Sequence, residues 1–217
     1  MTPGEHSLFK QLTNEDSSLL SSKDFAMDWV SKAWESFQYF SKEIQDAEEI
    51  AGLACSQNTA ALQWISPRLH NDRDFILKIA RGDVSGETLN HLSIELSNDT
   101  EIVMTALAKN GLNLGAVSEN MKDNPTVVLF AINKNPLAFM HASYRLRDDP
   151  EIALAAMEKA KGRTTISVFN YVGSALWNMC KGLNDEQKVA HLRAFTERNK
   201  LANKHLQNPT PPKIEAL

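Results

Sequence analysis

Apolar residues recur along most of this chain at intervals of three and four positions, the period of an amphipathic α-helix. The clearest stretch is residues 137–162, which read LAFMHASYRLRDDPEIALAAMEKAKG. Phe139, Ala142 and Leu146 share one face of its first half, and a second apolar set begins at Ile152 after a polar turn. The pattern predicts two short helices joined by a tight turn, each with one face that must be buried.

The same pattern returns upstream at nearly constant intervals. Successive shifts of 25, 25, 27 and 25 residues align the apolar positions, and the last match is the weakest. The predicted units lie near residues 37–58, 59–83, 84–111, 112–136 and 137–162. Repeats of this length bury their apolar faces by stacking on their neighbours. We therefore predict an all-α fold, a right-handed α-solenoid of short (25–27 residue) two-helix repeats with N- and C-terminal capping helices.

Short polar residues mark the start of the second helix in four units. Their side-chain oxygens can accept hydrogen bonds from the free amides of a first helical turn, so we predict N-caps and not metal ligands. They are Asp72, Asp99, Asn124 and Asp149, with Pro125 and Pro150 in the first helical position after two of them. Helix stops are predicted at Gly82, Gly111, Gly162 and the Asn135–Pro136 pair.

Serine recurs in one register of the predicted first helices. The residues are Ser41, Ser66, Ser93, Ser118 and Ser143. We interpret them as small residues at the margin of the buried face, where the hydroxyl bonds back to a carbonyl four residues earlier. A ladder of phosphorylation or ligand sites is the alternative.

The repeats sit within one predicted domain. Residues 1–22 are polar and rich in serine, which predicts a flexible N-terminal segment with at most a short turn. Residues 23–206 form a single helical-repeat domain, beginning with a helix capped by Ser22.

The C-terminal part of that domain is predicted to close the stack. Residues 163–206 read as a helical cap, with one helix over 164–180 and a last helix from Asn184 or Asp185 to about residue 205. Residues 207–217 have three prolines within four positions and are predicted to be a Pro-rich tail.

Three runs of the chain resemble a known family. LQWISPRLHNDRDFI, LNHLSIELSNDTEIV and FMHASYRLRDDPEIAL are similar to the tandem repeats of the domain of unknown function 4116 family, whose pattern is roughly L-x-aromatic-A-S-x-x-L-x-x-D-x-x-h-V, with h apolar. The chain departs from it at the aromatic position, with His91, Ala116 and His141. The resemblance covers about half the chain. It implies an all-helical repeat module, frequent in proteins of intracellular bacteria, including effectors delivered into host cells, and implies no activity.

Composition narrows the function classes. A net charge of −4 argues against a nucleic-acid binder, which usually shows a basic face. Cys55 and Cys180 lack a CxxC spacing or a histidine cluster, so they read as buried apolar side chains. No secretory signal and no apolar run of transmembrane length is present, so we expect a soluble chain, cytoplasmic at synthesis.

Motifs of common enzymes are missing from the sequence. It has no HExxH, GxSxG, GxxxxGK[ST] or GxGxxG motif, and no paired-cysteine zinc spacing. We therefore predict a protein that is not an enzyme and has no catalytic residues, cofactor or metal. A Cys55–His70 pair is the weak alternative, since a thiol beside an imidazole can act as a nucleophile.

One flank of the predicted first helices gathers residue types that are common at binding hot spots. The set is Trp64, Arg68, His91, His141, Tyr144 and Arg145. Two alternatives stay open for it, packing between units or contact with a partner protein. In the first case the binding surface would lie on the second helices, around Lys78, Thr105 and Lys109.

These observations favour a scaffold or adaptor that binds another protein. Its specific form would be a bacterial effector or a regulator of one, delivered into a host cell by a specialised secretion system. A nucleic-acid-binding helical repeat and an atypical enzyme without a recognisable motif are the alternatives.

Overall fold

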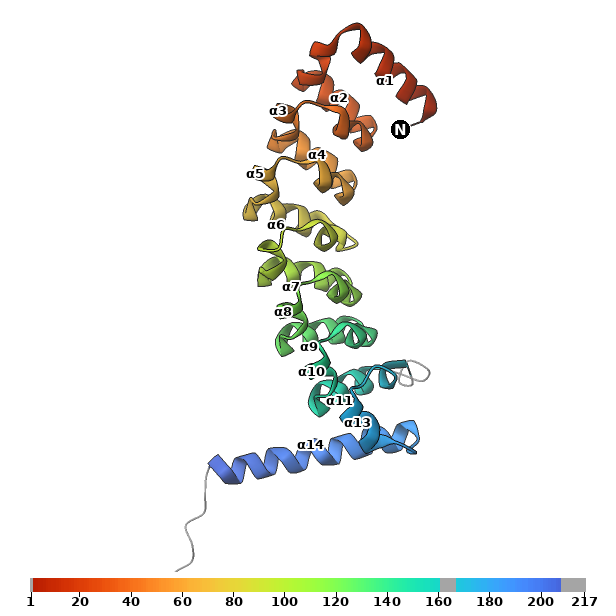
Figure 1. Ribbon diagram of the computed structural model, residues 1–217, viewed down its shortest axis with the longest axis vertical. Helices are drawn as coiled ribbons and strands as arrows, with labels where there is room; N and C mark the ends of the chain where they lie inside the picture. The colour runs from red at the N-terminus through yellow and green to blue at the C-terminus, as the bar shows by residue number, and fades with distance from the viewer. Residues whose placement is uncertain (1, 161–166, 208–217) are drawn as a thin grey trace, which may run out of the picture.

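The computed structural model describes residues 2–160 and 167–207, with side chains described as far as Lys200. Every regular element in these ranges is helical, and the elements stack into the elongated column of Figure 1. The predicted all-α repeat fold is confirmed. No helix within the described residues is long and apolar enough to cross a membrane.

The repeat contains three helical segments in a fixed order, which run from the predicted second helix of one unit to the predicted first helix of the next. The first is a ten-residue α-helix: α2 (Lys23–Lys32), α4 (Glu48–Gln57), α6 (Arg73–Gly82), α7 (Thr100–Lys109), α9 (Pro125–Lys134) and α11 (Pro150–Lys159). The second is a 3₁₀ helix: η2 (Trp34–Tyr39), η3 (Thr59–Trp64), η4 (Glu87–His91), η6 (Gly111–Ala116) and η7 (Pro136–His141). The third is a short helix: α3 (Lys42–Gln45), α5 (Pro67–His70), η5 (Leu96–Asn98), α8 (Glu119–Lys122) and α10 (Tyr144–Arg147).

Like segments stack on like segments. The ten-residue helices contact one another in the order α2, α4, α6, α7, α9 and α11, and the 3₁₀ helices form a second column beside them. The core lies between the columns. In α7, for example, Ile102, Val103, Ala106 and Leu107 are fully buried. We call the six ten-residue helices the helix column.

The predicted first helix of each unit is divided in the structure. Ile65 (ψ 160°) and Ser66 (ψ 154°) are extended, so η3 ends before them and α5 begins after them. The break occurs because the Ser66 side chain caps a new helix, accepting from the amide of Leu69 at 3.2 Å. Leu62, Ile65 and Leu69 are nevertheless all buried, as predicted, since each helical piece keeps its apolar side toward the core.

The predicted N-caps of the ten-residue helices are confirmed. Asp72, Asp99, Asn124 and Asp149 each accept hydrogen bonds from two first-turn amides, and Ser22 caps α2. These bonds satisfy amides that have no partner inside the helix.

The N-terminal segment, predicted to be flexible, is helical in the structure. Helix α1 (Pro3–Glu15) begins with a capping box in which Thr2 and Glu5 bond reciprocally. Its Phe9 is 2% exposed and lies 5.1 Å from Trp29 and 5.7 Å from Phe40, measured between ring centroids. A 3₁₀ helix, η1 (Ser17–Ser21), then leads into α2. The prediction from polar composition overlooked the buried side chain of Phe9 and the N-cap at Thr2.

The C-terminal end also differs from its prediction in one detail. The helix expected over 164–180 is interrupted, and α13 (Ser174–Cys180) starts after Gly173. A Cβ atom on Gly173 would lie 2.1 Å from Cγ of Asp148, so a larger residue there would displace that carboxylate. Asp148 accepts from the amides of Ala175 and Leu176, both at 3.1 Å, and thereby caps α13.

Helix α14 (Asp185–Gln207) closes the stack, starting where predicted, after Asn184. It packs on α11, where Arg193 forms an ion pair with Glu158 at 2.7 Å (Figure 1). The predicted helix stop at Gly162 lies outside the described residues, as does the Pro-rich tail beyond Gln207.

Candidate partner-binding surfaces

The repeating serines join neighbouring units. The hydroxyls of Ser66, Ser118 and Ser143 donate to side chains of the preceding unit: Asp46, Asn98 (2.7 Å) and Asp123 respectively. The same three hydroxyls accept from amides of the short helices that they cap. The predicted bond to a carbonyl four residues earlier is therefore wrong at these positions, because the serine starts a helix and does not lie inside one.

Two arginines of the predicted binding flank reinforce the same junctions. Arg68 donates to Asp46 at 2.9 Å, and Arg145 donates to Asp123 at 3.1 Å. Each guanidinium also donates to the main-chain carbonyl of its aspartate, at 2.8 and 2.9 Å. Hydrogen bonds from the serines and then from the arginines hold the pKa of both carboxyls below the usual range. These arginines are thus engaged within the protein.

The aromatic and histidine members of the flank lie at unit boundaries. Trp64 stacks on Trp34 of the preceding unit, with ring centroids 5.5 Å apart. The half-buried ring of His141 lies 3.1 Å from the place of a Cβ on Gly115. Burial, and then the charge of Lys122, lowers the pKa of His141. Both positions match the packing alternative.

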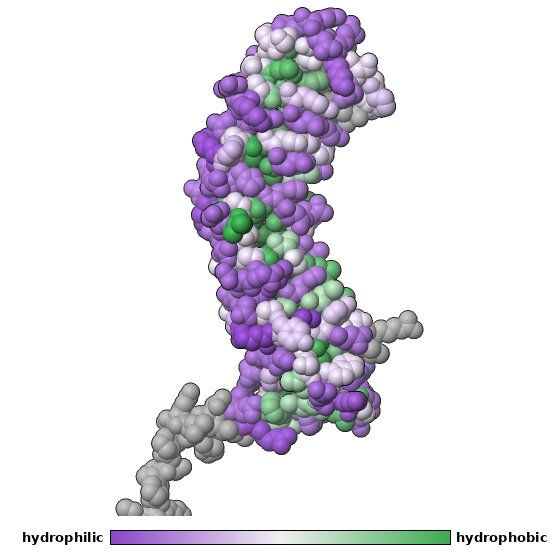
Figure 2. All heavy atoms as spheres, viewed as in Figure 1, coloured by the Kyte–Doolittle hydropathy of each residue, from purple (hydrophilic) through white to green (hydrophobic). Residues whose placement is uncertain are grey.

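His91 and Tyr144 complete the flank. The main-chain carbonyl of His91 accepts from Nε2 of His70 at 2.7 Å. Tyr144 is 65% exposed, and the guanidinium of Arg147 lies 5.1 Å from its ring centroid. Figure 2 shows the hydrophobic patches of one face as separate areas between hydrophilic ones. The flank is therefore a row of junctions with one large exposed ring, and its role in binding stays a prediction.

A second surface lies on the helix column. Positions 2, 5, 6 and 9 of a ten-residue helix share the side opposite the buried positions 3, 4, 7 and 8. We call this side the outer face. Its fifth position is apolar in every helix: Met27, Gly52, Leu77, Met104, Leu129 and Leu154. Lys78 and Thr105, which the sequence analysis singled out, occupy the sixth position.

Charge is segregated across the outer face. The second position is acidic in all but α9: Asp24, Glu49, Asp74, Glu101 and Glu151. The tenth position is basic in four helices: Lys32, Lys109, Lys134 and Lys159. Acidic first turns and basic last turns complement the helix dipole. Along each helix, the second position precedes the apolar fifth position and the tenth position follows it, so the acidic and basic residues lie toward opposite ends of the helix.

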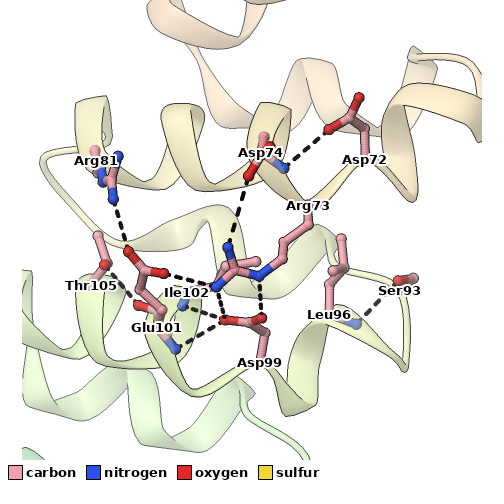
Figure 3. Close-up of polar contacts among 10 residues, drawn as sticks. All are labelled: Asp72, Arg73, Asp74, Arg81, Ser93, Leu96, Asp99, Glu101, Ile102 and Thr105. Atoms are coloured by element: carbon pink, nitrogen blue, oxygen red, sulfur yellow. Dashed lines mark hydrogen bonds and ion pairs between the residues drawn. The ribbon is translucent and has the colours of Figure 1, made fainter.

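One part of the acidic row is neutralised internally. Arg73 of α6 donates to Asp99 at 2.7 Å and to Glu101 at 2.8 Å, and Arg81 donates to Glu101 at 2.8 Å (Figure 3). Burial alone would raise the pKa of Asp99, but the bonds from Arg73 and from two amides lower it on balance. Hydrogen bonds from Arg73 and Arg81 lower the pKa of Glu101 as well. This network joins α6 to α7.

The outer face is hollowed at two places. A groove of about 670 Å³ lies between α4 and α6, with Met27, Gly52, Leu53 and Ile79 among the residues that line it. We call it the Gly52 groove. A smaller hollow of about 300 Å³ lies between α9 and α11, next to the 40% exposed Leu129.

The groups considered for chemistry are engaged or buried. Burial raises the pKa of Cys55 to about 12 and also raises that of Cys180, and buried thiols of this kind are unreactive. Among the described residues, no group of three His, Cys, Asp or Glu side chains could hold a metal ion.

The groove was not predicted from the sequence. Its signals are a glycine in the otherwise large fifth position and the 27-residue interval between two units, which lengthens one turn. Neither signal identifies a groove until the register of neighbouring helices is known.

Comparison with known proteins finds a family match for the central part of the chain. Residues 83–122 and 124–176 match the family model described as Domain of unknown function (DUF4116), which confirms the resemblance seen in the sequence. No curated protein and no solved structure shows significant similarity to this chain.

Proposed function

We propose that this protein, two stretches of which match the DUF4116 repeat, is a non-enzymatic helical-repeat scaffold that binds another protein through its outer face. The observation that carries the proposal is the apolar row at position 5, which is buried at Leu77, 40% exposed at Leu129 and half-buried in the other helices, together with the charged residues at positions 2 and 10. Apolar surface left open along a stack of helices favours contact with a partner.

The outer face supports this role better than the predicted flank does. On the flank, the side chains of Arg68, Arg145 and Trp64 contact the neighbouring unit. On the outer face, Leu129 is 40% exposed beside a hollow, and Lys109 and Lys134, at the adjoining tenth position, are exposed. An extended or helical segment of a partner could follow the row from unit to unit.

A matched pair of variants tests the proposal. Lys109→Glu with Leu129→Glu alters the outer face, and Lys10→Glu with Leu8→Glu makes the same changes on α1, where both residues are exposed. We expect the outer-face variant to capture its partner from an extract of the source cells at least about tenfold less well than wild type. The α1 variant should capture it normally, and both should keep wild-type circular dichroism.

Three results would contradict this. If the wild-type protein retains no partner, it is not a binding scaffold. If both variants lose capture equally, the effect is one of net charge. If only Tyr144→Ala loses capture, the binding surface is the flank.

The more specific form that we favour is a bacterial effector or a regulator of one, which the family resemblance supports. Delivery into a host cell would be visible as entry of a reporter enzyme fused to this chain.

A further inference from the structure

We propose that the Gly52 groove is a docking site for a peptide segment of a partner protein that presents one or two large aliphatic side chains next to lysine or arginine. This inference rests on the proposed function and gives it a place and a chemistry. Three features of the groove carry it: its floor, its wall and the charge of its rim.

The floor is open because of one glycine. Every other helix of the column carries Met or Leu at the position of Gly52. A Cβ atom on Gly52 would meet a single atom within 4 Å, Cε2 of Phe75 at 3.9 Å. The space that a leucine or methionine would fill in the other helices is therefore free here, between Met27 and Ile79. A side chain of that size from a partner can occupy it.

The wall is a turn held in one conformation. The buried carboxylate of Asp83 accepts from the amides of Ser85 and Thr88 and from both of their hydroxyls, at 2.8–2.9 Å. Gly86 has a φ of +77°, which glycine adopts without strain. Asn113 of the next unit donates to the carbonyl of Ser85 at 2.9 Å. A wall fixed in this way loses little conformational entropy when a ligand docks.

The rim carries unneutralised negative charge. Glu48, Glu49 and Glu87 line the groove and are exposed. Lys78 is the basic residue of the lining and lies 3.7 Å from Glu48. Within the described part of the chain, no cation lies at ion-pair distance from Glu49 or Glu87, in contrast to Glu101, which has two arginines. The unpaired carboxylates select a partner segment with basic residues beside its aliphatic ones.

Peptide binding tests the site directly. The probe is a fluorescent peptide of sequence GSRKLMKRSG, measured by fluorescence polarisation with the full chain. Controls are the same peptide with serine at the two aliphatic positions, and one with glutamate at the four basic positions. We expect the first peptide to bind and each control to bind at least about tenfold more weakly.

Gly52→Met should weaken binding of the first peptide at least about tenfold, because the new side chain fills the floor of the groove. It should not unfold the protein, since methionine favours a helix more than glycine does. Gly4→Met is the matched control, because Gly4 lies in α1 with nothing within 4 Å of an added Cβ. Glu49→Gln with Glu87→Gln should also weaken binding, while Glu186→Gln with Glu197→Gln, exposed on α14, should not.

The proposal is overturned if the first peptide does not bind, if the acidic peptide binds as well, or if Gly52→Met leaves the affinity unchanged. It is also overturned if sedimentation shows a wild-type dimer that Gly52→Met dissociates, since the occupant is then a second copy. If both wild type and Gly52→Met capture the cellular partner, the groove is not the binding site, but the proposed function is still supported. If the wild-type protein captures no partner, the proposed function itself is wrong.

Discussion

At Ser66, Ser118 and Ser143, one hydroxyl group makes two hydrogen bonds that serve different levels of the structure. As an acceptor it caps a four-residue helix, which is too short to be stable alone. As a donor it reaches an aspartate or asparagine of the preceding unit, 20 residues earlier in the chain. Local order and stacking therefore depend on the same atom.

Ser143→Ala should consequently cost about 0.5–2 kcal/mol of unfolding free energy, the range for loss of an N-cap. Urea denaturation followed by circular dichroism measures it. Ser174→Ala is the control, because Ser174 is exposed in the first turn of α13 and makes no cap bond. Equal losses of unfolding free energy in the two variants would show that the two hydrogen bonds of the Ser143 hydroxyl do not stabilise the fold.

Acid should weaken the network around Arg73. The pKa values of Asp99 and Glu101 are lowered from ordinary values of 3.8 and 4.5, so their ion pairs stabilise the fold above these values. This stabilisation is lost as the pH falls through the lower folded-state pKa values. We expect Arg73→Gln to melt at a lower temperature than wild type at pH 7, and the difference to be smaller at pH 3, which is below the ordinary pKa values of both carboxyls. Differential scanning calorimetry at both pH values checks this, and an undiminished difference at pH 3 would contradict it.

At the scale of single elements, some signals in the sequence are local and others are not. The caps of the ten-residue helices could be predicted, because Asp, Asn and Pro act on amides two or three residues away. The division of each first helix could not, because its apolar residues keep a helical spacing across the break at Ile65 and Ser66. The second partner of each serine lies 20 residues away, and only the alignment of units reveals it. Predicting the groove would also require knowing how neighbouring units pack, since Gly52 and the turn at Asp83 come from different units.

Helix α1 offers a direct test of the element that the composition concealed. Phe9→Ala should cost about 3–5 kcal/mol, the range for removing a buried phenylalanine, because Phe9 fills a cluster with Phe25, Trp29 and Phe40. Thermal unfolding followed by tryptophan fluorescence measures the loss. Leu8→Ala, at a 49% exposed position of the same helix, should change little. If the two variants melt alike, α1 does not pack as described.

At the scale of the whole molecule, repetition turns the features of one helix into features of a surface. A charge or an apolar residue at a fixed position of each ten-residue helix recurs along the molecule, because each of these helices packs on the next. A unit that departs from the repeat pattern therefore interrupts the surface at one position. The longer turn after α6 and the glycine of α4 interrupt the rows at the Gly52 groove.

Several bonds between units join a side chain to a residue translated earlier, which matters while the chain is being made. Ser66, Arg68, Ser143 and Arg145 all bond to residues 20 to 22 positions earlier, and Arg193 bonds to a residue 35 positions earlier. A unit leaving the ribosome thus finds its partners already outside the exit tunnel. Since domains fold from the N-terminus during synthesis, these residues can bond to a unit that is already made, whereas Arg73 and Arg81 bond to residues translated 20 to 28 positions later. The apolar face of a unit stays exposed only until the next unit, a few dozen residues long, has been added and packs on it. This limits the time in which nascent chains could aggregate.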